Sequence, residues 1–167
     1  IPQKAGLGGG SMNSASILNF LIKRKFIKMT QKQVIKTSNL IGSDVILGIK
    51  PSNTILTSNH NVKRFFNCPK FFTLLVKPNF GCSTKNIYSK VKKFKKSKYS
   101  KPKKSMFTYQ FLADQENSLE KIVLSEYPNL KKIKKFLSES KNVSFVRMTG
   151  SGSVLVAYYQ SKQDCEI

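Results

Sequence analysis

A run of glycines that leads straight into a helix-like segment is the feature that most limits how this chain can fold. Four of the five residues from Gly6 to Gly10 are glycine. A backbone without side chains can adopt positive φ angles and approach a ligand closely. The apolar residues that follow have helical spacing: Ala15, Leu18, Leu21 and Ile22. Because a helix N-terminus presents N–H groups and a positive dipole end, the pattern predicts a phosphate-binding loop, with a flexible surface linker as the alternative.

Three common glycine loops are excluded by the residues after Gly10. A P-loop needs Gly-Lys-Ser/Thr, whereas Gly10 is followed by Ser11 and Met12. The dinucleotide fingerprint and the protein-kinase loop both need a glycine where Ser11 stands. The remaining pattern, Pro2-x-x-Ala5-Gly6-Leu7-Gly8-Gly9-Gly10-Ser11, resembles the phosphate loop of the galactokinase, homoserine kinase, mevalonate kinase and phosphomevalonate kinase (GHMP) superfamily. Its triple glycine is most similar to the 4-diphosphocytidyl-2-C-methyl-D-erythritol kinases of that superfamily.

The resemblance implies that this loop holds the phosphates of ATP. The residues that it assigns to ATP are Pro2, Gln3, Lys4, Ala5, Gly6, Leu7, Gly8, Gly9, Gly10, Ser11 and Met12. Met12 stands where the family has a second serine, so one hydroxyl that could serve phosphate or Mg²⁺ is missing. The chain also begins inside this motif without a methionine. We therefore expect a fragment that lacks the N-terminal part and is inactive on its own.

Asp44 is the only acidic residue among the first 113. It lies in a mostly apolar segment after a predicted helix end, where an unpaired carboxylate would be costly to bury. From the residues alone, a functional carboxylate and an ordinary cap or turn aspartate are equally compatible with this position. The segment Leu40-Ile41-Gly42-Ser43-Asp44-Val45 resembles the family's Leu-Gly-Ala-Asp-Val-Pro motif, and the resemblance implies that Asp44 is the catalytic base. In the family, a lysine near the N-terminus pairs with this aspartate.

Two further motifs resemble the substrate-binding part of the family. The first runs from Pro78 through Cys82-Ser83-Thr84 to Tyr88, and it implies that Ser83, Thr84 and Tyr88 contact the substrate. Tyr88 would stack on cytosine; the alternative is that it packs under the lysine-rich segment that follows. The second motif is Thr149-Gly150-Ser151-Gly152, of which Gly150, Ser151 and Gly152 would close over the substrate. Without the resemblance, this stretch would be interpreted as a tight β-turn.

The periodicity of the sequence predicts an α+β chain. Expected helices run from about Ser11 to Lys25, from Thr30 (with Gln33 as a capping box) to Gly42, from Ser118 to Tyr127, and onward from Pro128, with Leu130, Ile133, Phe136 and Leu137 facing inward. Expected strands are Thr54–Thr57, a buried Phe71–Val76, Val143–Met148 and Val154–Tyr159. The lysine-rich stretch Lys90–Lys104 is expected to be a mobile loop. We expect residues 1–62 to be the remainder of an ATP-binding domain and residues 63–167 a substrate domain.

The net charge of +22 would usually indicate a nucleic-acid partner or an anionic membrane. Only three of the 30 basic residues are arginine, however, and arginine is the residue that reads bases and phosphates in a bidentate way. Ordinary solvated lysines on an enzyme are therefore the favoured interpretation. Cys68, Cys82 and Cys165 form no close pair, and with His60 as the single histidine they do not predict a metal site in the protein. Reduced thiols in a cytoplasmic protein fit these cysteines best.

Four motifs in the family's order make the resemblance specific, and together they imply a function. The expectation is a cytoplasmic, bacterial, ATP- and Mg²⁺-dependent kinase of non-mevalonate isoprenoid synthesis. It would phosphorylate the 2-hydroxyl of a small-molecule substrate, the cytidine diphosphate-linked methylerythritol, with no nucleic-acid or membrane partner. The implied fold has a ribosomal S5 domain 2-like N-terminal part and a ferredoxin-like C-terminal domain. The alternatives are homoserine or mevalonate kinase, and a non-catalytic basic protein that binds nucleic acid.

Overall fold

The computed structural model describes residues 3–57, 61–93 and 101–166 of the 167-residue chain. The α+β chain divides into two compact units. Unit 1 comprises Ile1–Leu7, Pro69–Lys95 and Ser105–Ile167, and unit 2 comprises Gly8–Cys68 and Lys96–Lys104, as far as these ranges are described. The expected division at residue 62 stays a prediction about the domains of the full-length protein.

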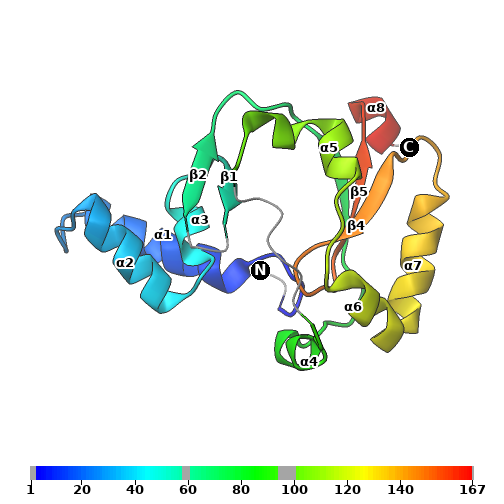
Figure 1. The fold of residues 1–167 in the computed structure, drawn as a ribbon, viewed down its shortest axis with the longest axis horizontal. Helices are drawn as coiled ribbons and strands as arrows, with labels where there is room; N and C mark the ends of the chain where they lie inside the picture. Colours follow the sequence, from blue (N-terminus) through cyan, green and yellow to red (C-terminus); the bar gives the residue numbers. More distant parts are fainter. Residues whose placement is uncertain (1–2, 58–60, 94–100, 167) are drawn as a thin grey trace. The chain divides into compact units, whose positions relative to one another are not determined.

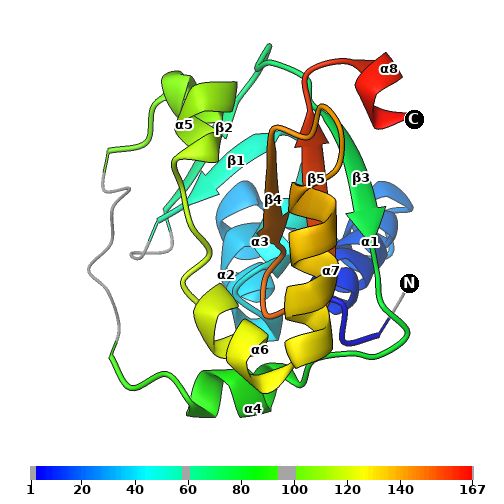
Figure 2. The same cartoon turned by 90° about the vertical axis from the view of Figure 1, so that its right-hand side faces the viewer.

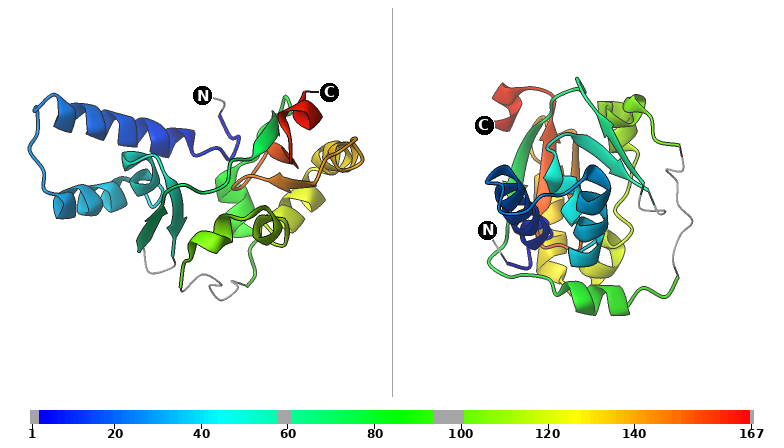
Figure 3. Two further views of the ribbon diagram at one scale, coloured as in Figure 1. Left: turned by 90° about the horizontal axis from the view of Figure 1, so that it is seen from above. Right: turned by 90° about the vertical axis from the view of Figure 1, so that its left-hand side faces the viewer.

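Unit 2 is built on three helices and a hairpin: α1 (Gly9–Lys23), α2 (Gln31–Ile41), α3 (Val45–Ile49), β1 (Asn53–Leu56) and β2 (Val62–Phe65). Helices α1 and α2 run in opposite directions, and α3 contacts both (Figures 1 and 3). Gly48 permits the close packing of α3 on α1, because a Cβ at this position would lie 2.7 Å from the Cβ of Ala15. Strands β1 and β2 pair antiparallel from Asn53 opposite Phe65 to Leu56 opposite Val62.

Unit 1 is an antiparallel three-stranded sheet with helices on one face. Its elements are β3 (Phe72–Val76), α4 (Thr84–Ser89), α5 (Tyr109–Ala113), α6 (Glu120–Glu126), α7 (Pro128–Ser138), β4 (Phe145–Met148), β5 (Leu155–Tyr159) and α8 (Lys162–Cys165), with a 3-10 helix at Lys104–Phe107. The strand order is β3-β5-β4. Helix α7 lies over β4 and β5, and α6 packs against α7 (Figure 2). The core between them contains Val123, Leu130, Leu137, Met148 and Leu155.

Most of the local signals in the sequence are confirmed. Thr30 and Gln33 form a capping box at the start of α2, and Gly42 is its C-cap. The four predicted strands are present, although their ends shift by one or two residues. Strand β2, helix α3 and helix α5 were not predicted. Pro2, His60 and residues 94–100 of the expected loop Lys90–Lys104 lie outside the described residues.

Two predictions about burial are wrong. Phe136 is 72% exposed. It lies six residues after Leu130, which places it off the buried stripe that Leu130 and Leu137 form along one face of α7. Strand β3 is largely exposed rather than buried. It is the terminal strand in the order β3-β5-β4 and has a single neighbour among the described strands, so Leu74 and Leu75 retain 40% and 56% of their exposure.

Candidate functional site

The first part of the glycine loop, Gln3–Leu7, belongs to unit 1 and is held through its main chain. The carbonyl of Lys4 accepts hydrogen bonds from the N–H groups of Cys82 (3.1 Å) and Ser153 (3.3 Å). The carbonyl of Ala5 accepts one from Val154 at 3.1 Å. Ala5 itself is 2% exposed and packs on Val154 and Val156. The loop is therefore fixed against the start of β5 through its main chain and the buried Ala5.

Two of the predicted glycine motifs touch each other at Gly6. The Thr149 hydroxyl donates a hydrogen bond to the Gly6 carbonyl at 2.9 Å. Gly6 has a φ of +71°, and a Cβ on it would lie 2.4 Å from the Thr149 carbonyl oxygen. Gly150 has a φ of +46°, and its Cβ would lie 2.9 Å from the Gly6 carbonyl oxygen. Both positions thus require glycine for conformation and for space.

The second part of the loop belongs to unit 2 and leads into α1. Gly8 is the N-cap of α1 with a φ of +66°, no side chain caps the helix, and its first turn has no acidic residue. A Cβ on Gly8 or Gly10 would meet nothing within 4 Å. The start of α1 is therefore a bare, positively polarised helix end that suits an anionic ligand. Met12 points elsewhere: its Sδ lies 2.9 Å from where a Cβ of Gly48 would be, so this departure from the family pattern serves the packing of α3.

Asp44 lies in the same unit, at the N-cap position of α3. Its side chain is exposed and does not cap the helix. The Ser43 hydroxyl donates to its Oδ1 at 3.4 Å, and no salt bridge reaches it from the part of the chain that is described. Helix α3, which begins directly after Asp44, packs through Gly48 on Met12 and Ala15 of α1. The carboxylate is therefore accessible, as a base that acts on a bound substrate must be.

The predicted substrate motif surrounds the start of α4 in unit 1. Ser83 is the N-cap and accepts a hydrogen bond from the N–H of Asn86 at 3.4 Å. The hydroxyls of Thr84 and Ser151 are hydrogen-bonded at 2.8 Å, so two residues 67 positions apart in the chain meet here. Tyr88 is 52% exposed, which leaves its ring available. Cys82 is fully buried, and burial raises the pKa of its thiol.

The turn Thr149–Gly152 is also held by Asn117, which was not among the predicted site residues. The Nδ2 of Asn117 donates to the carbonyls of Met148 (2.9 Å) and Gly150 (2.7 Å). Thr149 was likewise not among the predicted site residues. Both contacts join positions far apart in the chain, so no local pattern could have indicated them.

The structure thus gathers the predicted residues into two groups. Unit 1 brings together Gln3–Leu7, Ser83, Thr84 and Gly150–Gly152, with Tyr88 on the same helix as Thr84. Unit 2 holds Gly8–Met12 and Asp44. Within the described ranges, no cluster of three or more histidine, cysteine, aspartate or glutamate side chains could hold a metal ion. None of the described helices combines the length and apolar character that crossing a bilayer needs.

Comparisons with known proteins agree with the motif order. The family described as "GHMP kinases C terminal" matches residues 91–166. The chain is 56% identical to the 4-diphosphocytidyl-2-C-methyl-D-erythritol kinase of Pelagibacter ubique (strain HTCC1062), over 99% of this chain and 59% of that protein. It is 30% identical to the protein of the same name from Petrotoga mobilis, over 93% of this chain and 63% of that protein.

One solved structure has a similar fold over almost the whole chain. The crystal structure of a 4-(cytidine 5'-diphospho)-2C-methyl-D-erythritol kinase matches with a TM-score of 0.72 at 20% identity, covering 99% of this chain and 61% of that one. The chain therefore spans about three-fifths of the length of the relatives it matches.

Proposed function

We propose that this chain belongs to the GHMP kinase family, and that the protein containing it transfers the γ-phosphoryl group of ATP to the 2-hydroxyl of 4-diphosphocytidyl-2-C-methyl-D-erythritol. The observation that carries the proposal is the 56% identity to a protein of that name along 99% of this chain. The reaction belongs to non-mevalonate isoprenoid synthesis. Because ATP and such a charged substrate are cytoplasmic metabolites, the enzyme acts in the cytoplasm.

The glycine loop binds the phosphates of ATP. The uncapped start of α1 offers main-chain N–H groups and the positive end of its dipole, and phosphoryl transfer depends mainly on such positioning and charge stabilisation. The bare Cα atoms of Gly8 and Gly10 let the phosphates approach the backbone. Mg²⁺, when bound, neutralises charge on the triphosphate. Such an ion is usually held by one or two carboxylates together with phosphate oxygens and water.

Asp44 accepts the proton of the substrate's 2-hydroxyl as that oxygen attacks the γ-phosphorus. The bond from the γ-phosphorus to the bridging oxygen breaks, and ADP leaves with the electron pair. The exposure of Asp44 and the absence of a cap hydrogen bond support this role, because its carboxylate is not occupied by holding the fold. By the family resemblance, a lysine in the N-terminal part pairs with it.

The cytidine end of the substrate binds at the start of α4. Tyr88 provides an exposed ring for stacking on cytosine. Ser83, Thr84, Gly150, Ser151 and Gly152 surround the same place, and the hydrogen bond from Thr84 to Ser151 ties their two segments together.

The finer fold assignment is also a proposal. The order β3-β5-β4, with α6 and α7 between β3 and β4 in sequence, is that of the first three strands of a ferredoxin-like domain. Unit 2 then belongs to the ribosomal S5 domain 2-like part. The loop position, the helix that follows it and Asp44 beyond α2 support this assignment.

The full-length protein provides the test. With ATP and Mg²⁺ it should convert the cytidine substrate to its 2-phosphate, seen by ³¹P NMR and mass spectrometry, whereas homoserine and mevalonate should not react. Asp44→Asn should lower kcat by about 10²- to 10⁴-fold, the usual contribution of a general base. Its fold and its affinity for ATP should be retained, because among the described residues the Asp44 carboxylate bonds only to the Ser43 hydroxyl and does not cap α3. Turnover of homoserine or mevalonate instead would assign a different substrate, and an undiminished kcat in the variant would remove Asp44 from the chemistry.

A further inference from the structure

Among the described residues, Asn117 is the side chain that bonds to the carbonyl groups on both sides of Thr149. Its Nδ2 donates to the carbonyl of Met148 at 2.9 Å and to that of Gly150 at 2.7 Å. Its Oδ1 accepts the N–H of Leu119 at 2.9 Å, just before α6. The amide therefore joins the last residue of β4 to the turn that follows and ties both to the start of α6.

These partners fix the orientation of the amide. A carboxamide has two donors on its nitrogen and acceptors on its oxygen alone. Turned by 180°, Asn117 would place its oxygen against two carbonyl oxygens and its NH₂ against the Leu119 N–H, so all three hydrogen bonds would be lost. No other side chain of this size supplies two donors and an acceptor in this arrangement. The requirement is for an asparagine, rather than for a polar residue in general.

The turn that Asn117 holds carries two contacts to proposed site residues. Thr149 donates to the Gly6 carbonyl in the ATP loop at 2.9 Å, and Ser151 is bonded to Thr84 of the substrate motif at 2.8 Å. The Asn117 amide bonds to the carbonyls on either side of Thr149, and so sets how far the turn reaches toward Gly6 and toward Thr84. Glycines with φ of +46° and +81° at positions 150 and 152 make the turn itself pliable.

A second support from α6 acts on the strand and not on the turn. The Glu120 carboxylate, paired with Lys134, accepts the N–H of Met148 at 3.4 Å. It fixes the end of β4 but does not reach Gly150 or Ser151. Among the described side chains of α6 and the residues just before it, Asn117 is thus the one that bonds to the turn itself.

We propose that Asn117 is a positioning residue for catalysis, which holds the Thr149–Gly152 turn so that the ATP loop and the substrate motif are aligned at once. The inference rests on the proposed kinase function, because it acts through Gly6 and Thr84. Because Asn117 acts through the turn that contacts Gly6 and Thr84, its loss should raise KM for both substrates.

The test compares Asn117→Asp and Asn117→Ala in the full-length protein, with Asn129→Asp as the matched control. Asn129 is exposed in the first turn of α7, so the control makes the same chemical change away from the turn. Both Asn117 variants should raise KM for ATP and for the cytidine substrate on the order of 10- to 100-fold, the range that a misplaced site residue causes. Asn117→Asp should be at least as severe as Asn117→Ala, because it directs a carboxylate at two carbonyl oxygens. Asn129→Asp should stay within about twofold of wild type.

The opposite results separate the alternatives. If Asn117 merely filled space, Asn117→Ala would be the worse variant, with a lower melting temperature and both KM values unchanged. That pattern would overturn the inference. Wild-type protein without turnover of the cytidine substrate would instead overturn the proposed function, and it would be recognised before any variant is measured.

Discussion

The ring of Tyr88 is 52% exposed, although its neighbour Ile87 is completely buried. Ile87 anchors α4 in the core of unit 1, and Tyr88 is thereby presented outward from a fixed helix. An exposed aromatic ring on a rigid element contributes little to stability and can be kept for contact with a ligand. Ile87 therefore serves packing, and the adjacent Tyr88 is available for recognition of a ligand.

Replacing Tyr88 tests that division. Tyr88→Ala should raise KM for the cytidine substrate roughly 5- to 150-fold, which corresponds to the about 1–3 kcal/mol of one base stacked on an aromatic ring. Tyr88→Phe keeps the ring and should behave like wild type. KM for ATP and the melting temperature should change in neither variant. If Tyr88→Ala binds the cytidine substrate normally in steady-state kinetics, the ring does not stack on the base.

At the scale of elements, the glycine loop shows how one motif combines two different demands on glycine. Gly6 and Gly8 both have positive φ, +71° and +66°. A side chain on Gly6 would collide with the Thr149 carbonyl, whereas one on Gly8 would meet nothing within 4 Å. Gly6 is therefore required by packing in unit 1, and Gly8 by backbone conformation at the start of α1.

Alanine at each glycine distinguishes these demands. Gly8→Ala should lower the free energy of unfolding by about 1 kcal/mol, the cost of a left-handed conformation for an L-residue. Gly6→Ala should cost about 3 kcal/mol or more, because main-chain atoms must also move. Chemical denaturation of the two full-length variants measures both values. Equal losses would mean that the contact between Gly6 and Thr149 is not made in solution.

Elements whose cause is local could be predicted from the sequence. The capping box of Thr30 and Gln33 needs residues three apart, and the turn after β4 needs its glycines. The motif residues Thr84 and Ser151 could be predicted as site residues, but their hydrogen bond joins positions 67 apart, and no periodicity reports such a pairing. Asn117 and Thr149 were missed for the same reason. Phe136 was misassigned because hydrophobicity does not by itself tell which face of α7 is covered.

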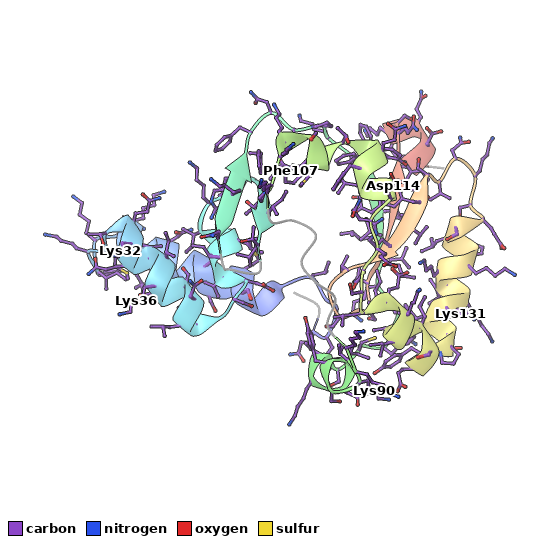
Figure 4. All side chains as sticks on the ribbon, viewed as in Figure 1. Lys32, Lys36, Lys90, Phe107, Asp114 and Lys131 are labelled. Atoms are coloured by element: carbon purple, nitrogen blue, oxygen red, sulfur yellow. The ribbon has the colours of Figure 1, made fainter. Side chains whose placement is uncertain are left out.

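For the molecule as a whole, the charge of +22 is borne by lysines on several separate elements. Figure 4 shows Lys32 and Lys36 on α2, Lys90 after α4 and Lys131 on α7. Two of the three arginines are used inside the fold. Arg64 donates to the carbonyls of Ile46 (2.7 Å) and Lys50 (2.6 Å), and Arg147 to that of Leu112 (2.6 Å). The residues best suited to read nucleic acid are thus committed to backbone carbonyls.

Salt dependence tests this view of the charge. Binding of the full-length protein to a random RNA should fall steeply between 50 and 200 mM salt, because lysine–phosphate contacts release counterions. Phosphorylation of the cytidine substrate at saturating ATP should change by less than about twofold over that range, since a bound, partly enclosed charge is screened less. Nanomolar RNA binding that survives the higher salt, in a protein that does not bind ATP, would favour the nucleic-acid alternative over the kinase.

The hydrogen bond from Thr149 to Gly6 also has a consequence for synthesis of the protein on the ribosome. Its two partners are 143 residues apart, so the nascent glycine loop emerges long before the turn that will hold it. At bacterial elongation rates of about 5–20 residues per second, the loop waits on the order of ten seconds for its partner. This contact can therefore form only after Thr149 has been synthesised, and a ribosome stalled before Thr149 would carry a nascent chain in which Gly6 still lacks it.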